Sequence, residues 1–129
     1  MSLGISFSGG VAVAASDKGF TIRTDQPEAA GGANSAPSPF DLFLASLGTC
    51  AGYFALRFCQ ERRIDTTGLS LSLEAKRDAE RHRLSRVCLT LHLPPGFPER
   101  YRSALIRATD QCTVKRAILD PPEFEVVAR

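Results

Sequence analysis

The most regular feature of the chain is an apolar stripe that repeats at steps of three and four residues between positions 39 and 63. Side chains at this spacing lie on one face of an α-helix. Ser38 fits the N-cap, Pro39 the first helical position and Asp41 the acidic position of a capping box. Because the stripe is rich in Phe and Leu, the pattern predicts a central, largely buried helix. The stripe consists of Phe40, Phe43, Leu44, Leu47, Cys50, Ala51, Phe54 and Phe58.

The segment before this helix predicts β-structure followed by a loop. Residues 3–24 predict two short strands joined at 17–19, where Asp, Lys and Gly favour a turn. Phe20 and Ile22 alternate with polar neighbours, as is typical of a strand with one buried face. Residues 25–37 contain two prolines and two glycines, so they predict a long loop.

The second half of the chain predicts two strands, two helices and a final strand. The strands show period-two alternation of leucines, and the longer helix follows a proline. The resulting order, ββ-α-ββ-αα-β, predicts an α+β domain with antiparallel sheet. The elements are strands at 69–75 and 87–93 around a polar turn at 76–84, a helix from Pro98 to Cys112, a short helix at 113–119 and a strand through Phe124, Val126 and Val127.

Composition indicates one globular domain and gives no support to nucleic-acid binding. A chain of 129 residues can bury its own core as a single domain, which we place at residues 1–129. The net charge is only +2, whereas an electrostatic nucleic-acid binder carries a clustered basic face. The one basic stretch, residues 76–86, is interrupted by Asp78 and Glu80 and is interpreted as a solvated turn.

The chain shows no obvious targeting or metal-binding pattern. Its first ten residues lack the charged and apolar regions of a secretory signal, and its apolar runs are broken short of the roughly 20 residues that span a bilayer. We therefore expect a cytoplasmic protein without membrane contact, whose cysteines remain reduced. No His or Cys residues fall at zinc-binding spacing, so neither a metal nor another cofactor is expected.

The four cysteines are the candidate reactive residues, and two of them have suggestive positions. Cys50 lies on the apolar stripe of the long helix, and Cys112 lies where the second predicted helix ends and the short one begins. A helix N-terminus lowers the pKa of a nearby thiol, which we expect for Cys112. The two thiols meet if their helices pack together; alternatively, each is a small buried core residue. Cys59 and Cys88 have no evident partner.

These residues resemble the OsmC/Ohr family, in particular its OsmC-like branch. Gly31-Gly32 and the run from Pro37 to Cys50 are similar to the family signature, a Pro-acidic-hydrophobic run that leads to a cysteine in the central helix. The Cys-Thr-Val sequence at 112–114 is similar to the second cysteine motif, in which the middle residue is usually Pro. A Gly9-Gly10 hairpin and the predicted last strand also match, so the resemblance covers nearly the whole chain.

The resemblance implies an intertwined homodimer in which antiparallel sheet from both subunits wraps two central helices. It also implies a thiol-dependent peroxidase. Cys50 would attack an organic hydroperoxide, and Cys112 would then form a disulfide with it. A dithiol reductant, such as a lipoylated protein or thioredoxin, would restore both thiols. Leu47 and Phe54 are the candidate walls of an apolar substrate pocket.

The chain departs from the family pattern where the first cysteine should be activated. Val11 stands in place of the family's arginine after Gly-Gly, and Phe40 in place of its glutamate. Asp41 is a candidate acid or simply a helix cap, and Arg57, seven residues after Cys50, is a candidate replacement for the arginine, as is Arg23 on the second strand. These departures leave open a second interpretation, a weakly active or non-catalytic dimer that responds to redox state or binds a small molecule.

Overall fold

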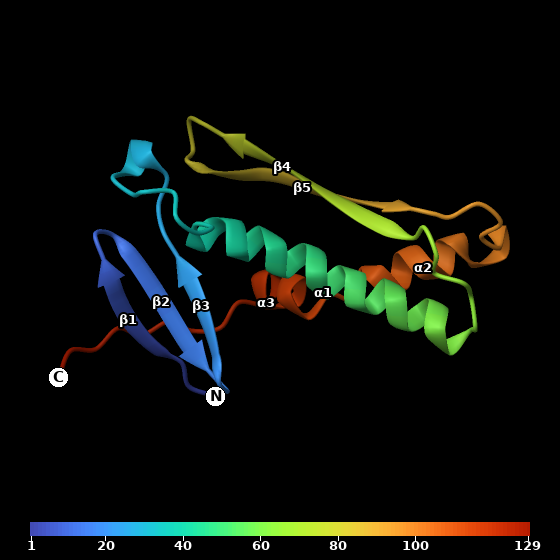
Figure 1. The fold of residues 1–129 in the computed structure, drawn as a ribbon. Coiled ribbons are helices and arrows are strands. Elements are labelled where there is room, and N and C mark those ends of the chain that lie inside the picture. Colours follow the sequence, from blue (N-terminus) through green and yellow to red (C-terminus); the bar gives the residue numbers. More distant parts are fainter. The chain divides into compact units, whose positions relative to one another are not determined.

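The computed structural model describes residues 1–129, which form two compact units, Met1–Ala45 and Ser46–Arg129. Helix α1 begins in the first unit and continues into the second (Figure 1). All strand pairs are antiparallel, so the predicted α+β class is confirmed. The regular elements are strands β1 (Gly4–Gly9), β2 (Ala12–Asp17), β3 (Phe20–Thr24), β4 (Ser70–Asp78) and β5 (Arg83–His92), and helices α1 (Pro39–Glu61), α2 (Arg102–Thr109) and α3 (Thr113–Leu119).

The N-terminal unit contains a three-stranded sheet in the order β1-β2-β3. The prediction of two strands in this region was wrong by one, because the chain also turns at Gly9 and Gly10. Both glycines have positive φ, 104° and 54°, a backbone conformation that glycine adopts without steric cost. The second turn, at Asp17 to Gly19, lies where the sequence predicted it.

The predicted loop at 25–37 is confirmed and is organised by the buried side chain of Asp25. Its carboxylate accepts hydrogen bonds from the N–H groups of Gln26, Ala33 and Ser35, at 2.8, 3.1 and 3.0 Å, and from the Ser35 hydroxyl at 2.6 Å. These bonds hold the pKa of Asp25 at about 2, although burial acts in the opposite direction. The loop is therefore an ordered structure and not a loose connection.

Helix α1 begins as the sequence predicts. The N–H of Ser38 donates to the Asp41 carboxylate at 2.9 Å, and the Asp41 N–H donates to the Ser38 hydroxyl at 3.1 Å. This reciprocal pair is a capping box. At the other end, Arg63 has a φ of 54° and the N–H of Ile64 donates to the Cys59 carbonyl, which ends the helix.

In the C-terminal unit, β4 and β5 form a hairpin that runs alongside α1 (Figure 1). The two strands extend into the predicted polar turn at 76–84 and leave only residues 79–82 between them. The hydrophobic core contains Ala55, Phe58 and Cys59 of α1 and Leu105 of α2, and leucines of both strands pack against it. The strands therefore cover α1 with the leucine faces that their alternation predicts.

Helix α1 is less buried within one chain than the prediction of a largely buried helix implies. Of the predicted stripe, only Leu47, Ala51 and Phe58 are buried. Outside the stripe, Tyr53 is 57% and Leu56 39% exposed, because β4, β5 and α2 cover only part of the helix surface. By length and composition α1 could cross a membrane, with a mean hydropathy of 1.4 over its most apolar window. Core helices of soluble proteins meet the same criterion, so this property is weak evidence that α1 spans a membrane. It nevertheless corrects the expectation that no apolar stretch of the chain is long enough to span a bilayer.

The C-terminal part differs from the prediction in two places. Helix α2 ends at Thr109, so Cys112 lies outside it and instead caps α3. Residues 121–129 form no strand, and Phe124, Val126 and Val127 are 87%, 98% and 63% exposed. A strand needs a neighbour for its backbone hydrogen bonds, and this segment pairs with neither sheet of its own chain.

Candidate active site

The structure brings Cys50 and Cys112 together, as their positions on two predicted helices suggested. Cys50 lies in the middle of α1, and the Cys112 thiol donates a hydrogen bond to the carbonyl of Leu47, one turn earlier, at 3.8 Å. The two thiols also hydrogen-bond to each other. All four cysteines are free thiols. Cys112 is 1% exposed, whereas Cys50 is partly accessible, so Cys50 is the thiol that an incoming molecule reaches first.

The first turn of α3 is directed at this pair. Cys112 is the N-cap of α3, and its Sγ accepts a hydrogen bond from the Lys115 N–H at 3.4 Å. Cys50 accepts hydrogen bonds from the N–H groups of Thr113 and Val114 and from the Thr113 hydroxyl. These N–H groups have no acceptor within the helix, and helix N-termini favour negative charge. Neutral donors therefore surround the Cys50 sulfur.

The pKa values of the two thiols move in opposite directions. Burial alone raises the pKa of Cys50, but the hydrogen bonds from Val114, Cys112 and Thr113 outweigh it, so the pKa of Cys50 is lowered. Burial raises the pKa of Cys112, and the neighbouring Cys50 raises it further by its hydrogen bond and its charge. Cys50 is therefore the more readily ionised of the two thiols. The prediction that α3 would lower the pKa of Cys112 was wrong. The N–H groups of Lys115 and Val114 do act in that direction, but burial and the neighbouring Cys50 outweigh them.

Asp41 is not available as an acid beside the thiols. Its carboxylate accepts the hydrogen bond from the Ser38 N–H, and this capping interaction holds the pKa of Asp41 below its usual range. Of the two alternatives raised by the sequence, the structure supports the helix cap.

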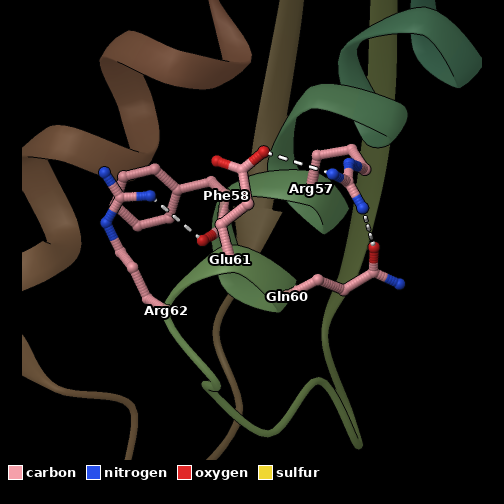
Figure 2. A network of polar contacts seen from close by, with 5 residues as sticks. All are labelled: Arg57, Phe58, Gln60, Glu61 and Arg62. Atoms are coloured by element: carbon pink, nitrogen blue, oxygen red, sulfur yellow. Dashed lines mark hydrogen bonds and ion pairs between the residues drawn. The ribbon is translucent and has the colours of Figure 1, made fainter.

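Arg57 is directed away from the thiols. Figure 2 shows its guanidinium bonded to Glu61 at 3.3 Å and to Gln60 at 3.2 Å, on the exposed surface of α1. Arg57 is not among the groups that shift the pKa of Cys50. Arg23 lies on β3 in the other unit. Within the C-terminal unit, then, no arginine replaces the one that the family pattern provides. The same view shows Arg62 stacked on the Phe58 ring at 3.7 Å.

The other two cysteines lie apart from this pair. Cys59 is 1% exposed in the hydrophobic core, and burial raises its pKa even though the nearby Arg62 acts in the opposite direction. Cys88 lies on β5 opposite Glu74. Neither has a thiol neighbour, as the sequence indicated.

The cavity next to the thiols differs from the predicted pocket. Leu47 is buried and contributes its carbonyl to Cys112, while Phe54 contacts the Tyr53 ring and lines a separate hollow. A cavity of about 320 Å³ lies between β5 and α2 and has the Cys112 side chain in its wall. The sequence identified its leucines only as strand and helix faces, because periodicity does not reveal where packing leaves space. Its apolar lining is Leu89, Leu91, Leu93, Leu105 and Ile106, and its polar lining is Thr90, Arg102, Thr109, Asp110 and Lys115.

No group of three or more His, Cys, Asp or Glu side chains is placed to hold a metal ion.

Solved structures with the same fold cover almost the whole chain. A Psychrobacter arcticus protein, provisionally described as an osmotic stress induced and detoxification response protein, has a TM-score of 0.78 at 20% identity, over 91% of this chain and 87% of that one. An OsmC-like protein from Mycoplasma pneumoniae has a TM-score of 0.74 at 14% identity, over 93% and 87%. An organic hydroperoxide resistance protein from Legionella pneumophila has a TM-score of 0.61 at 20% identity, over 92% and 89%.

No curated protein matches the sequence. The model of the OsmC-like protein family matches residues 32–127, a range that contains Cys50, Cys112 and every α-helix of the structure. The match covers most of the chain and includes the segment from Pro37 to Cys50 that carries the sequence resemblance. This chain therefore belongs to the OsmC-like protein family.

Proposed function

We propose that the protein is a thiol-dependent peroxidase that reduces organic hydroperoxides to alcohols. The observation that carries this proposal is the paired arrangement of Cys50 and Cys112, whose pKa values are shifted in opposite directions. A peroxidatic cysteine reacts as the thiolate. A resolving cysteine must lie beside it and keep its proton until the first step is complete.

In the first step, the Cys50 thiolate attacks the terminal oxygen of the hydroperoxide. The O–O bond breaks, the sulfur is oxidised to a sulfenic acid and the alkoxide leaves as an alcohol after taking up a proton. The neutral donors around the Cys50 sulfur stabilise the thiolate before attack. Because these donors are fixed by α3 and Cys112, they are in place without rearrangement.

In the second step, Cys112 forms a disulfide with Cys50 and water is lost. The hydrogen bond and the negative charge of the Cys50 thiolate both raise the pKa of Cys112. The negative charge is lost when the Cys50 sulfur becomes a neutral sulfenic acid. Oxidation of Cys50 therefore makes Cys112 the stronger nucleophile at the moment when it is needed. An external dithiol, such as a lipoylated protein or a thioredoxin-like protein, then reduces the disulfide by exchange.

The proposal agrees with what is known of similar proteins. The Legionella protein with the same fold is described as an organic hydroperoxide resistance protein. The apolar cavity beside Cys112 favours organic over inorganic peroxides, because an alkyl group gains free energy by leaving water. We place the reaction in the cytoplasm, where dithiol reductants keep such cysteines reduced.

We also propose that the protein works as a homodimer. The N-terminal sheet leaves large apolar side chains in water, with Phe7 88% and Phe20 73% exposed, and the C-terminal segment leaves Phe124 and Val126 equally uncovered. Exposed apolar surface of this kind marks association sites. A second copy of the chain would cover it.

A second candidate function is a weakly active or non-catalytic dimer that responds to redox state or binds a small molecule. The observation in its favour is that no cation of the C-terminal unit is among the groups that shift the pKa of Cys50. The cavity of about 320 Å³ could hold such a ligand.

Single-turnover oxidation separates the two functions. The fully reduced protein is mixed with one equivalent of cumene hydroperoxide, and thiol loss is followed by intact mass and peptide mapping. Rapid loss of two thiols with a Cys50–Cys112 disulfide supports the peroxidase. Oxidation no faster than that of free cysteine contradicts it and favours the binding or sensing function.

A further inference from the structure

The C-terminal unit has a second pocket, between the residues that follow α1 and those that follow β5. Its volume is about 310 Å³, and neither thiol of the candidate active site lines it. Three arginines do, namely Arg62, Arg63 and Arg100. Together with Asp65, the one acid of the lining, they give the pocket a net charge of +2. The chemistry of this pocket is therefore separate from that of the cysteine pair.

None of the three arginines forms an ion pair with a carboxylate. Two acids close to them in the sequence, Glu61 and Glu99, pair instead with Arg57 and Arg102. Asp65 accepts a hydrogen bond at 2.9 Å from the N–H two residues further along the chain. Like charges that line one pocket without a counter-charge repel one another, and a bound anion would relieve this repulsion.

Two of the guanidinium groups are held in place by aromatic rings. Arg62 lies over the Phe58 ring, 3.7 Å from its centroid, and donates to the Phe58 carbonyl at 3.2 Å (Figure 2). Arg100 lies over the Tyr101 ring at 4.8 Å, and the two rings meet edge to face at 6.0 Å. A stacked side chain has less conformational freedom to lose, so it binds an anion at a smaller entropic cost.

The third arginine occupies a position that normally favours glycine. The N–H of Ile64 donates to the Cys59 carbonyl and the N–H of Arg63 to the Gln60 carbonyl, which is the pattern of a Schellman motif. Arg63 has a φ of 54°, in the left-handed region where a side chain with a Cβ lowers stability. Arg63 thus weakens the helix end and adds a charge to the pocket, a combination typical of binding sites.

We propose that this pocket binds a small phosphate monoester in its dianionic form. Guanidinium groups present paired N–H donors that match phosphate oxygens. The charge of +2 in the lining is opposite to the roughly two negative charges of the ester near neutral pH. Pro94, Pro95 and Phe97 give the pocket an apolar wall for the organic part of the ligand. This site does not depend on the proposed peroxidase function.

The test is isothermal titration of the full-length protein with phenyl phosphate at low salt. We expect saturable binding, one ligand per chain, that weakens roughly fivefold from pH 7.5 to pH 5 as the ester takes up a proton with a pKa of about 6. The pocket keeps its own charge over this range. Arginines do not titrate there, and the Thr67 N–H holds the pKa of Asp65 below its usual range. Phenyl sulfate, a monoanion at both pH values, should bind more weakly and without pH dependence.

Arg63→Gly separates binding from folding. The loss of one charged contact should weaken phenyl phosphate binding about tenfold, while glycine in the left-handed conformation should raise the Tm by a few degrees. Arg100→Gln should weaken binding by a similar factor. Arg86→Gln removes an equal charge from β5, outside the pocket, and is the matched control that should bind like the parent.

Weaker binding in both pocket variants, with the control unchanged, supports the proposal. It is overturned if phenyl phosphate shows no saturable binding at millimolar concentration, or if phenyl sulfate binds equally well. Equal weakening in Arg86→Gln would also overturn it, because it would show a general attraction to the basic surface. Cys50→Ser should bind phenyl phosphate like the parent, so this result and the peroxidase assay are independent of each other.

Discussion

At the scale of single residues, the chemistry depends on an asymmetry between two thiols that have similar positions in the sequence. Each lies on or beside an apolar helix face, and only the family resemblance, not their spacing, ranks Cys50 as the attacking thiol. The structure separates them, because the first N–H groups of α3 are directed at Cys50 while Cys112 is 1% exposed and donates to a carbonyl. In the proposed mechanism, the roles of attacking and resolving thiol follow from this difference in hydrogen bonding.

The assignment of roles predicts different outcomes for the four cysteine variants. Cys50→Ser should abolish peroxide consumption, because it removes the nucleophile. Cys112→Ser should allow one turnover and then stop with Cys50 as a sulfenic acid, which dimedone labelling followed by mass spectrometry would detect. Cys59→Ser and Cys88→Ser are the controls and should retain recycling. Equal loss of activity in all four variants would refute the assignment.

The lowered pKa of Cys50 predicts the pH dependence of its reaction. The rate of oxidation by a hydroperoxide should rise with pH and level off below the ordinary thiol value of 9.0, since only the thiolate attacks. Cys112→Ala removes one donor to that thiolate, so its rate profile should move to higher pH. Stopped-flow measurement from pH 5 to 10 checks both. A parent profile that levels off only above pH 9.0 would contradict the stabilised thiolate.

At the scale of elements, the loop before α1 is held by one carboxylate. The pKa of Asp25 is lowered from 3.8 to about 2 by its bonds to Ser35, Gln26 and Ala33. A group with a lowered pKa stabilises the folded state above its unfolded pKa, and this contribution is lost as the pH falls through the folded value. Thermal stability should therefore decrease between pH 4 and pH 2 in the parent. The decrease should be smaller in Asp25→Asn, and an identical pH dependence of the two melting temperatures would show that the bonds contribute nothing.

The same loop requires glycine at position 32 for reasons of space. A Cβ atom there would lie 1.9 Å from the backbone carbonyl oxygen of Gln26, which cannot move aside as a flexible side chain would. We expect Gly32→Ala to destabilise the fold by about 2 kcal/mol or more. Gly4→Ala, where no atom lies within 4 Å, is the control. Chemical denaturation of both variants would measure the difference, and equal stabilities would contradict the clash.

At the scale of the whole molecule, the chain has more apolar surface than its own core can bury. The predicted last strand has no partner within the chain, and α1 is only partly covered. Both features are consistent with the proposed dimer, in which a second chain supplies the missing neighbours. The long helix would then be buried by association and not by the fold of one chain alone.

The C-terminal segment provides a test of that association. Phe124→Ser and Val126→Ser remove apolar side chains that are 87% and 98% exposed, so in a monomer they should change stability little. If the segment packs against a second copy, the double variant should dissociate at concentrations at which the parent remains dimeric. Analytical ultracentrifugation measures this, with Glu125→Gln as the control. A parent protein that is monomeric at all concentrations would refute the dimer.

The elements that local rules govern could be predicted from the sequence. The capping box at Ser38 and Asp41, the span of α1, the short helix at 113–119 and the two leucine strands all follow from spacing and turn chemistry. Cys50 and Cys112 were identifiable as the candidate pair because they lie on helix faces within a recognisable motif. Such features depend on residues a few positions apart, which periodicity describes directly.

The tertiary structure alone decided what depends on contacts between distant segments. It placed Cys112 at the cap of α3, directed the N–H groups of Thr113 and Val114 at Cys50, turned Arg57 towards Glu61 and left the cavity between β5 and α2. None of these follows from spacing, because a hydrogen bond or a cavity is set by the mutual orientation of whole elements. The sequence identified the candidate thiols, and the packing of α3 against α1 determined which of them has the lowered pKa.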